Sequence, residues 1–254
     1  MTNGFDFVVA GSAAVAAGIV NALAGGGTLI TFPTLTFLGL PSIEANITNT
    51  VALCPGYLGG TLSQYKDTQG QKKRLGPLLS AAILGGVLGG LLLLHTSEHL
   101  FRTIVPFLIL LASVLLASQN RIRGWLTQRS GKSSGTPNLE RLATPLVGLA
   151  AIYGGYFGAG LSVIVLSVLG LTIDDSLTRL NATKQAVAFA ANAGVALLFI
   201  FSNRVVWPMA LVMAAGSLIG GAMGGRLAAG IKSETLRWVV VSIGIIVGII
   251  YLIR

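Results

Sequence analysis

Apolar runs of about 20 residues follow one another along nearly the whole chain, and a helix of that length crosses the hydrocarbon core of a bilayer. Only 10% of the 254 residues are charged and 53% are hydrophobic, with a mean hydropathy of +0.81. A soluble domain carries about 25% charged residues. The sequence therefore predicts an all-α integral membrane protein, with eight to ten membrane segments crossing the lipid bilayer of the cell (inner) membrane.

The apolar segments form two sets with a polar stretch between them. That stretch is rich in Ser, Gly, Thr and Arg, as expected for a solvated linker. We expect a first transmembrane repeat over 1–118, a basic cytoplasmic linker over 119–141 and a second repeat over 142–254. The apolar segments are Phe5–Ala24, Thr28–Leu40, Asn46–Gln64, Leu75–Leu94, His99–Ser118, Leu142–Phe157, Gly158–Leu171, Asn181–Phe201, Val205–Ala229 and Leu236–Ile253.

The second half repeats the first at an offset of about 131 positions. Glycine is common in this chain, so a single match means little, but a series in one register that includes a proline indicates an internal duplication. The matched pairs include Gly27 with Gly158, Gly39 with Gly170, Pro77 with Pro208, Gly85 with Gly216 and Gly89 with Gly220.

Each half begins with an apolar stretch that is too long for one span, and glycines interrupt both stretches, at Ala24–Thr28 and at Gly154–Gly160. Glycine inside a helix costs about 1 kcal/mol relative to alanine, so we expect both helices to break there. Broken backbone at membrane depth is tolerated only where it is buried in protein or lines a polar cavity. Two matching breaks therefore predict one shared site.

The net charge of +9 would suggest a nucleic-acid partner in a soluble protein, but most Lys and Arg here lie between apolar segments. The positive-inside rule explains that placement, so we expect no nucleic-acid partner. If each broken stretch enters and leaves on the same side, the two repeats are inverted and more of the 17 basic residues lie in the cytoplasm. The charge bias thus favours inverted repeats with both termini outside. The two cytoplasmic clusters are Lys66, Lys72, Lys73 and Arg74, and Arg121, Arg123, Arg129, Lys132 and Arg141.

No residue set in the sequence resembles a catalytic site or a cofactor site, so we expect a protein that is not an enzyme. Cys54 is the only cysteine, which excludes an internal disulfide and a thiolate metal site. His95 and His99 flank Glu98 at a spacing that a metal could use, but a polar turn between two helices explains them better.

The helix breaks are the best candidates for a binding site, because the free N–H groups of a half-helix start suit an anion. Thr28 and Gly160 begin the two half-helices, and Gly26, Gly27 and Gly158 let a ligand approach the backbone. The alternative is that these glycines only permit close helix packing.

A polar stretch opens the next membrane segment in each half and supplies further candidates. Asn49 and Thr50 in the first half and Thr183 in the second can donate to an oxyanion, or they can cap helices. Lys184 can either contact an anionic substrate or extend to the membrane interface. Asn21 also lies in an apolar run, where it can line the path or bond a neighbouring helix.

Two glycine-rich runs, Leu84–Gly90 and Gly216–Gly225, place small residues four apart on one helix face. Such faces let backbones approach closely. We expect them to pack helices together, either within the chain or between the copies of a homodimer.

Taken together, the duplication and several short motifs resemble the sulfite exporter TauE/SafE family of small membrane transporters. The motifs are Ala24–Pro33, Ala45 with Thr48–Thr50, the repeated helices that run from Pro77 and Pro208 to paired glycines, and Arg204–Trp207. The resemblance implies secondary export or uptake of small anions, such as sulfite, sulfoacetate or other organosulfonates. The second half departs from the Gly-Gly-Gly pattern, because it has Phe157–Gly160 at the matching place.

These expectations combine into a secondary transporter that moves a small anionic substrate by alternating access. Coupling to a proton or Na+ is expected, because the sequence has no ATP-binding P-loop. The eight acidic residues all fall at segment ends or in loops, so no proton-carrying carboxylate is evident in the membrane. An anion channel and an assembly factor for a larger membrane complex are the alternatives.

Overall fold

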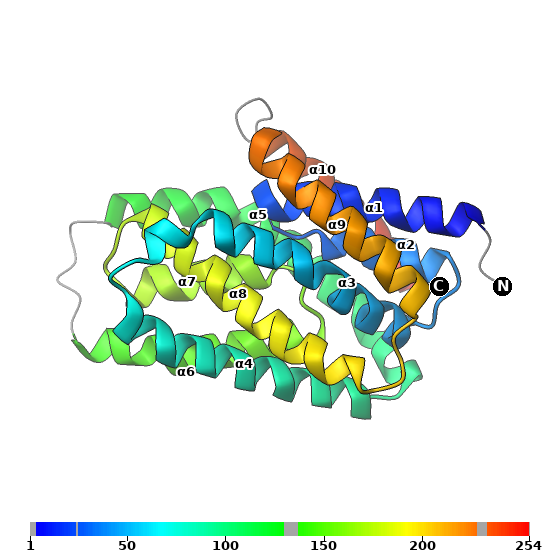
Figure 1. Ribbon diagram of the computed structural model, residues 1–254, viewed down its shortest axis with the longest axis horizontal. Helices are drawn as coiled ribbons and strands as arrows, with labels where there is room; N and C mark the ends of the chain where they lie inside the picture. The colour runs from blue at the N-terminus through cyan, green and yellow to red at the C-terminus, as the bar shows by residue number, and fades with distance from the viewer. Residues whose placement is uncertain (1–3, 24, 130–136, 228–232, 254) are drawn as a thin grey trace.

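The computed structural model describes residues 4–23, 25–129, 137–227 and 233–253, and within them the chain is entirely helical apart from turns (Figure 1). The helical prediction is therefore confirmed. The elements are α1 (Gly4–Leu23), α2 (Thr28–Phe37), α3 (Ser42–Ser63), the short 3-10 helix η1 (Tyr65–Thr68), α4 (Lys72–His95), α5 (Glu98–Arg129), α6 (Pro137–Tyr156), α7 (Leu161–Thr172), α8 (Leu177–Ile200), α9 (Trp207–Leu227) and α10 (Ser233–Ile253).

Several of these helices have the length and composition of membrane spans. Five apolar stretches reach at least 18 residues, namely Gly4–Asn21, Lys73–His95, Glu98–Leu126, Leu177–Ile200 and Glu234–Ile253. Three shorter apolar helices accompany them, at Thr28–Phe37, Leu161–Thr172 and Trp207–Met223. Large apolar side chains such as Phe107 and Val114 on α5 are 60% exposed, as expected for a lipid-facing surface. The protein is a multi-pass membrane protein.

Side-chain contacts at the helix starts show in which direction the helices run. Glu98 at the start of α5 accepts hydrogen bonds from the N–H groups of Ser42 and Ile43, at 2.5 and 3.1 Å, so α3 and α5 start at the same end. Arg74 at the start of α4 pairs with Glu140 and Asp175, so α4, α6 and α8 start together. In Figure 1 these two ends lie opposite one another, and α1 begins at the end where α10 finishes.

The two halves pack against each other through corresponding helices. Helix α1 packs along α9 of the other half, and α6, the counterpart of α1, packs along α4, the counterpart of α9. In the same way α3 packs along α9, and its counterpart α8 packs along α4. Helices α3 and α8, and α5 and α10, pair with their own counterparts. These pairings are those of a duplicated chain, and the inverted relation between the two halves stays a prediction.

The glycine-rich runs lie at these helix pairs and pack within the chain. A Cβ added to Gly89 of α4 would overlap the carbonyl oxygen of Ile152 on α6, and one added to Gly220 of α9 would overlap that of Val15 on α1. Backbones this close leave room only for hydrogen at Cα. Within the chain, the structural interpretation of both runs is confirmed.

The polar stretch between the halves is shorter than expected, because α5 continues past Ser118 to Arg129 and α6 begins at Pro137. The extension is amphipathic: Gln119 and Leu126 are 3% and 4% exposed, while Asn120 and Trp125 face outward. Leu126 packs against Gly170 of α7. A helix with one buried side therefore replaces most of the expected loop.

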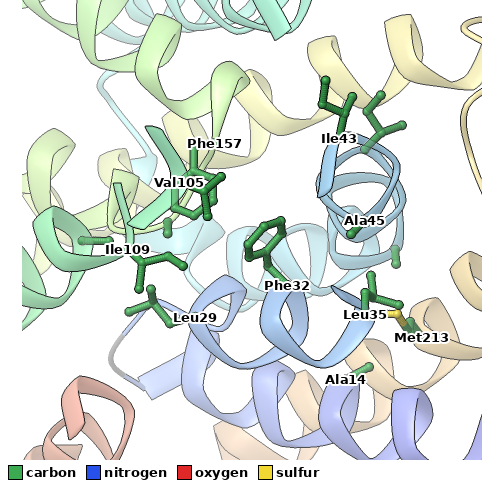
Figure 2. Close-up of a cluster of buried hydrophobic side chains, with 14 of the residues drawn as sticks. Ala14, Leu29, Phe32, Leu35, Ile43, Ala45, Val105, Ile109, Phe157 and Met213 are labelled. Carbon is green, nitrogen blue, oxygen red and sulfur yellow. The ribbon is translucent and has the colours of Figure 1, made fainter. Parts of the chain in front are cut away.

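The buried apolar side chains form two clusters. The larger one gathers most of its residues from α1, α2, α3, α5, α9 and α10, and it also includes Leu93 of α4, Phe157, Val163 of α7 and Phe199 of α8; Figure 2 shows part of it around Phe32. The smaller one lies among α4, α6, α7 and α8 and includes Val147, Leu166 and Val187.

Candidate functional site

The first helix break separates α1 from α2 and is confirmed at the predicted place. Gly25 and Gly26 have φ angles of +78° and +97°, a left-handed conformation in which a Cβ is strained. The N–H of Gly27 donates to Oδ1 of Asn21 at 2.8 Å. Asn21, whose role the sequence left open, thus bonds the break that follows its own helix.

The second break separates α6 from α7 and uses the same backbone device. Gly158 and Gly160 have φ angles of +82° and +78°, and Gly160 caps the start of α7 at Leu161. The hydroxyl of Tyr153 donates to the carbonyl of Ala159 at 2.7 Å. The second break is therefore also confirmed, although its sequence differs from the first.

The two breaks meet in space, although they are far apart in the sequence. A Cβ on Gly25 would lie 3.3 Å from Cβ of Ser162, which is in the first turn of α7. A Cβ on Gly26 would lie 3.0 Å from Cδ2 of Leu116, and one on Gly160 would lie 3.4 Å from Cα of Ala112. Ala112 and Leu116 are one turn apart on α5, so one face of this helix contacts both breaks.

Helix α3 also contacts both breaks, through two asparagines one turn apart. The hydroxyl of Thr31 on α2 donates to Oδ1 of Asn49, and Nδ2 of Asn49 donates to Oγ1 of Thr28 at 3.4 Å. Nδ2 of Asn46 donates to the carbonyl of Tyr156, the last residue of α6, at 2.9 Å. The break site is defined here as Asn21, Gly25–Thr28, Asn46, Asn49 and Gly158–Ser162.

The predicted residues of the second half lie elsewhere along α8. Thr183 donates to Oε1 of Gln71 at 3.1 Å, and the Lys184 amine donates to Oδ1 of Asn181 at 2.8 Å. Asn181 in turn donates to Gln64, at the end of α3, at 2.9 Å. These five residues form the Lys184 cluster.

The Lys184 cluster lies apart from the break site. Helices α3 and α8 are antiparallel, so the polar starts of α3 and α8 lie at opposite ends of the pair, and the predicted residues form two groups. Lys184 is only 6% exposed, so its amine lies inside the bundle. Thr50 is buried, and its hydroxyl donates to the carbonyl of Asn46 at 2.9 Å within its own helix.

Open pockets lie at the two ends of the bundle. The Arg102 pocket, of about 1050 Å³, is lined by Arg102, Thr36 and Tyr251 among others and lies where α3 and α5 start. The Arg74 pocket, of about 880 Å³, lies where α4 and α8 start. Across the Arg74 pocket, Arg74 pairs with Asp175 at 3.3 Å and with Glu140, which joins the two halves.

Three fully buried phenylalanines lie between the break site and the Arg102 pocket. Along α2, Thr28 lies in the break site, Thr36 lines the pocket, and Phe32 stands between them. Phe32 packs edge-on against Phe157, with ring centroids 5.5 Å apart, and against Phe101 at 6.4 Å. Figure 2 shows Phe32 and Phe157 with Val105 of α5 close by. The route on this side is filled with side chains.

The histidine pair lies at the exposed turn between α4 and α5. Nδ1 of His95 bonds to the carbonyl of Leu91 at 2.8 Å, and both histidines are exposed. In the part of the chain that the structure describes, no group of three His, Cys, Asp or Glu side chains could hold a metal ion.

Comparison with known proteins identifies the family of this chain. The family model described as "Sulfite exporter TauE/SafE" matches residues 10–251.

The chain belongs to the TauE/SafE family.

Relatives across this family carry the name of membrane transporters. A probable membrane transporter protein of Haemophilus influenzae is 27% identical over 216 residues, which is 83% of this chain and 80% of the relative. The probable membrane transporter protein ORF9 of a Sinorhizobium species is 28% identical, over 92% of this chain and 88% of the relative. The probable membrane transporter protein YfcA of Escherichia coli is 25% identical, over 90% and 82%.

Sequence reasoning identified the TauE/SafE breaks but missed several residues around them. Asn46 was missed although it lies three positions before the predicted Asn49, a helical spacing that places both on one face of α3. Ser162 lies in the first turn of the helix after the second break, and this position in the sequence could have marked it as well. No sequence signal identifies Ala112 and Leu116, because small and apolar residues are common in all the helices described here.

Proposed function

We propose that this TauE/SafE protein is a secondary transporter that moves a small anion by alternating access, and that the anion binds at the break site. The observation that carries the proposal is the meeting of two broken helices against one face of α5. In membrane transporters, half-helix starts at a repeat interface hold anionic groups of the substrate. The family description names a sulfite exporter, which favours sulfite as the cargo, and organosulfonates such as sulfoacetate are the other candidates that the sequence resemblance implies.

The buried surroundings of the break site support transport in preference to an open channel. Phe32, Phe101 and Phe157 are at most 1% exposed, so a continuous pore does not pass between them. A transporter needs such a barrier on one side of its site at a time. The absence of a catalytic set among the sequence motifs, together with the names of the relatives, favours transport over catalysis as well.

The proposal is tested by measuring uptake of radiolabelled sulfite and sulfoacetate into liposomes that carry the purified protein, with imposed proton or Na+ gradients. Saturable flux that a gradient drives uphill is the expected result. No flux of either anion through correctly inserted protein would overturn the proposal, and flux that neither saturates nor moves uphill would favour a channel.

Gly26→Leu tests whether the break site is the binding site. The new side chain would meet Leu116 in a left-handed backbone conformation, so we expect it to fill the space between the breaks and abolish flux. Gly39→Leu is the matched control, because Gly39 has a φ angle of +91° but no atom near its Cβ position. Normal flux in Gly26→Leu would remove the site assignment.

Gly27→Leu is a poorer test than the sequence suggests. A Cβ on Gly27 would lie 2.6 Å from the carbonyl oxygen of Ala17. A side chain there pushes against backbone, so we expect loss of folded protein as well as of flux.

A further inference from the structure

The side-chain oxygen of Asn46 is a buried hydrogen-bond acceptor, and the hydrogen bond that the side-chain nitrogen makes determines which way this oxygen points. The side chain is 1% exposed, and its Nδ2 donates to the carbonyl of Tyr156 at 2.9 Å. A carbonyl only accepts, so the nitrogen faces Tyr156 and the oxygen faces away from it. Within the described part of the chain, Oδ1 has no hydrogen-bond partner. A buried acceptor without a donor is costly, so a bound molecule that donates a hydrogen bond to Oδ1 would be stabilised there.

The surroundings of Asn46 offer donors as well as this acceptor. The first turn of α7 uses the N–H groups of Leu161, Val163 and Ile164, which donate to Gly158 and Gly160. Among the described residues, the N–H groups of Gly160 and Ser162 have no such partner. For an anion bound at this break, acceptor oxygens alone would satisfy the N–H groups but not Oδ1 of Asn46, whereas an oxyanion that keeps one proton would satisfy both.

The acidic side chains of the protein do not reach this position. Asp6, Glu44, Glu98, Glu140 and Glu234 lie in the first turns of their helices, Asp67 lies in η1, and Asp174 and Asp175 lie between α7 and α8. Each of the eight is thus at the end of a helix or in a connection. A proton delivered to the break site would therefore have to come from a bound molecule and not from a carboxylate of the protein.

We infer that Oδ1 of Asn46 accepts a hydrogen bond from a proton on the transported anion, so that the bound species is a singly protonated oxyanion. The inference rests on the proposed function and narrows it. For sulfite, the species is hydrogen sulfite. A site built to bond a substrate hydroxyl rejects an analogue that lacks it, because the buried polar group is then left unpaired. Each turnover also carries a proton across with the anion, which couples transport to the proton gradient.

The test compares two anions of similar size and charge in the liposome assay. Hydrogen sulfite carries a hydroxyl proton that can donate a hydrogen bond, whereas methanesulfonate is a singly charged anion whose three oxygens only accept. We expect the native protein to transport sulfite about tenfold faster or more, and its sulfite flux to fall as pH rises and sulfite loses its proton. Equal rates for the two anions across this pH range overturn the inference, and this arm needs no variant.

Asn46→Leu keeps the side-chain shape and removes both polar groups. We expect the preference for sulfite over methanesulfonate to shrink to about twofold or less, because no side-chain oxygen then accepts a hydrogen bond from the substrate proton. A purely structural role would lower both fluxes equally and leave their ratio unchanged, which overturns the inference. Asn192→Leu, which replaces another buried asparagine whose Nδ2 bonds its own helix at Ala188, is expected to keep the native ratio.

The outcomes separate this inference from the proposed function. Saturable flux of sulfite and methanesulfonate at equal rates would support the proposed anion transporter and overturn the inference that the site recognises a substrate proton. No flux of either anion through inserted native protein overturns both. If Asn192→Leu loses the preference for sulfite to the same degree as Asn46→Leu, the preference does not come from a hydrogen bond between Asn46 and the substrate proton.

Discussion

At the residue scale, asparagine side chains replace the hydrogen bonds that the broken helices lose. An amide both donates and accepts, so it satisfies backbone groups without a permanent charge inside the membrane. Asn21 accepts from Gly27, and Asn46 donates to Tyr156. Asn49 bonds two hydroxyls of α2 instead. The polar groups of the break site are therefore backbone groups, amides and hydroxyls, and the buried amine of Lys184 lies in another cluster.

Lys184 provides the residue-scale test of whether its cluster lies on the transport route. Lys184→Met keeps the length of the side chain and removes its charge. If an anion passes the amine, the KM for sulfite should rise by roughly tenfold, since hydrogen bonds to charged groups contribute about 1.5–3 kcal/mol. Initial rates in liposomes measure it, with exposed Lys66→Met as the control. An unchanged KM would place Lys184 off the route.

At the element scale, glycines determine how closely the helices pack, and the same residue type has opposite effects along one helix. On α4, Gly89 lies against the backbone of α6, whereas a Cβ on Gly76 would meet nothing within 4 Å. Position along the helix pair, not helix propensity, decides which of them is required.

Gly89→Ala and Gly76→Ala should therefore change stability in opposite directions. Gly76→Ala should stabilise by up to about 1 kcal/mol, because alanine is the better helix former. Gly89→Ala should destabilise by at least 1–3 kcal/mol, because the methyl group forces α4 and α6 apart. Thermal unfolding in detergent measures both. A shift of the same sign in the two variants would contradict the close α4–α6 contact.

The sequence predicted the helix breaks because glycine runs are energetically poor helix, and this property is local. It did not predict what faces each break, because Ala112 and Leu116 differ in nothing from other small and apolar residues of α5. The continuation of α5 to Arg129 was also missed, since its polar composition hides a buried side formed by Gln119 and Leu126. Helix direction decides which polar residues lie together. Because α3 and α8 are antiparallel, Thr183 and Lys184 on α8 lie far along the pair from Asn49 on α3.

At the scale of the whole molecule, the break site lies inside the bundle and a pocket opens at each end. Phenylalanine rings fill the space toward the Arg102 pocket, while ion pairs of Arg74 hold the opposite end together. Alternating access requires these two barriers to open in turn. The inverted repeat stays a prediction that the exchange of helix partners favours.

The helix directions predict on which side of the membrane each connection lies. Single cysteines at Asn203, between α8 and α9, and at Gln69, between η1 and α4, should react with a membrane-impermeant thiol reagent from opposite sides. Both positions are exposed, and Cys54→Ser removes the native thiol. The positive-inside rule places Gln69 in the cytoplasm. Labelling of both from the same side would contradict the directions of α3 and α8.

The face of α5 formed by Ala112 and Leu116 limits how the two halves can diverge. A duplicated protein is free to specialise one copy while the other keeps its role, provided that the copies do not share a surface. Here a bulkier side chain at Ala112 would press on the second break, and a shift of α5 to accommodate it would move Leu116 away from Gly26. The two half-sites therefore have to change together, and a new cargo calls for paired substitutions in both repeats.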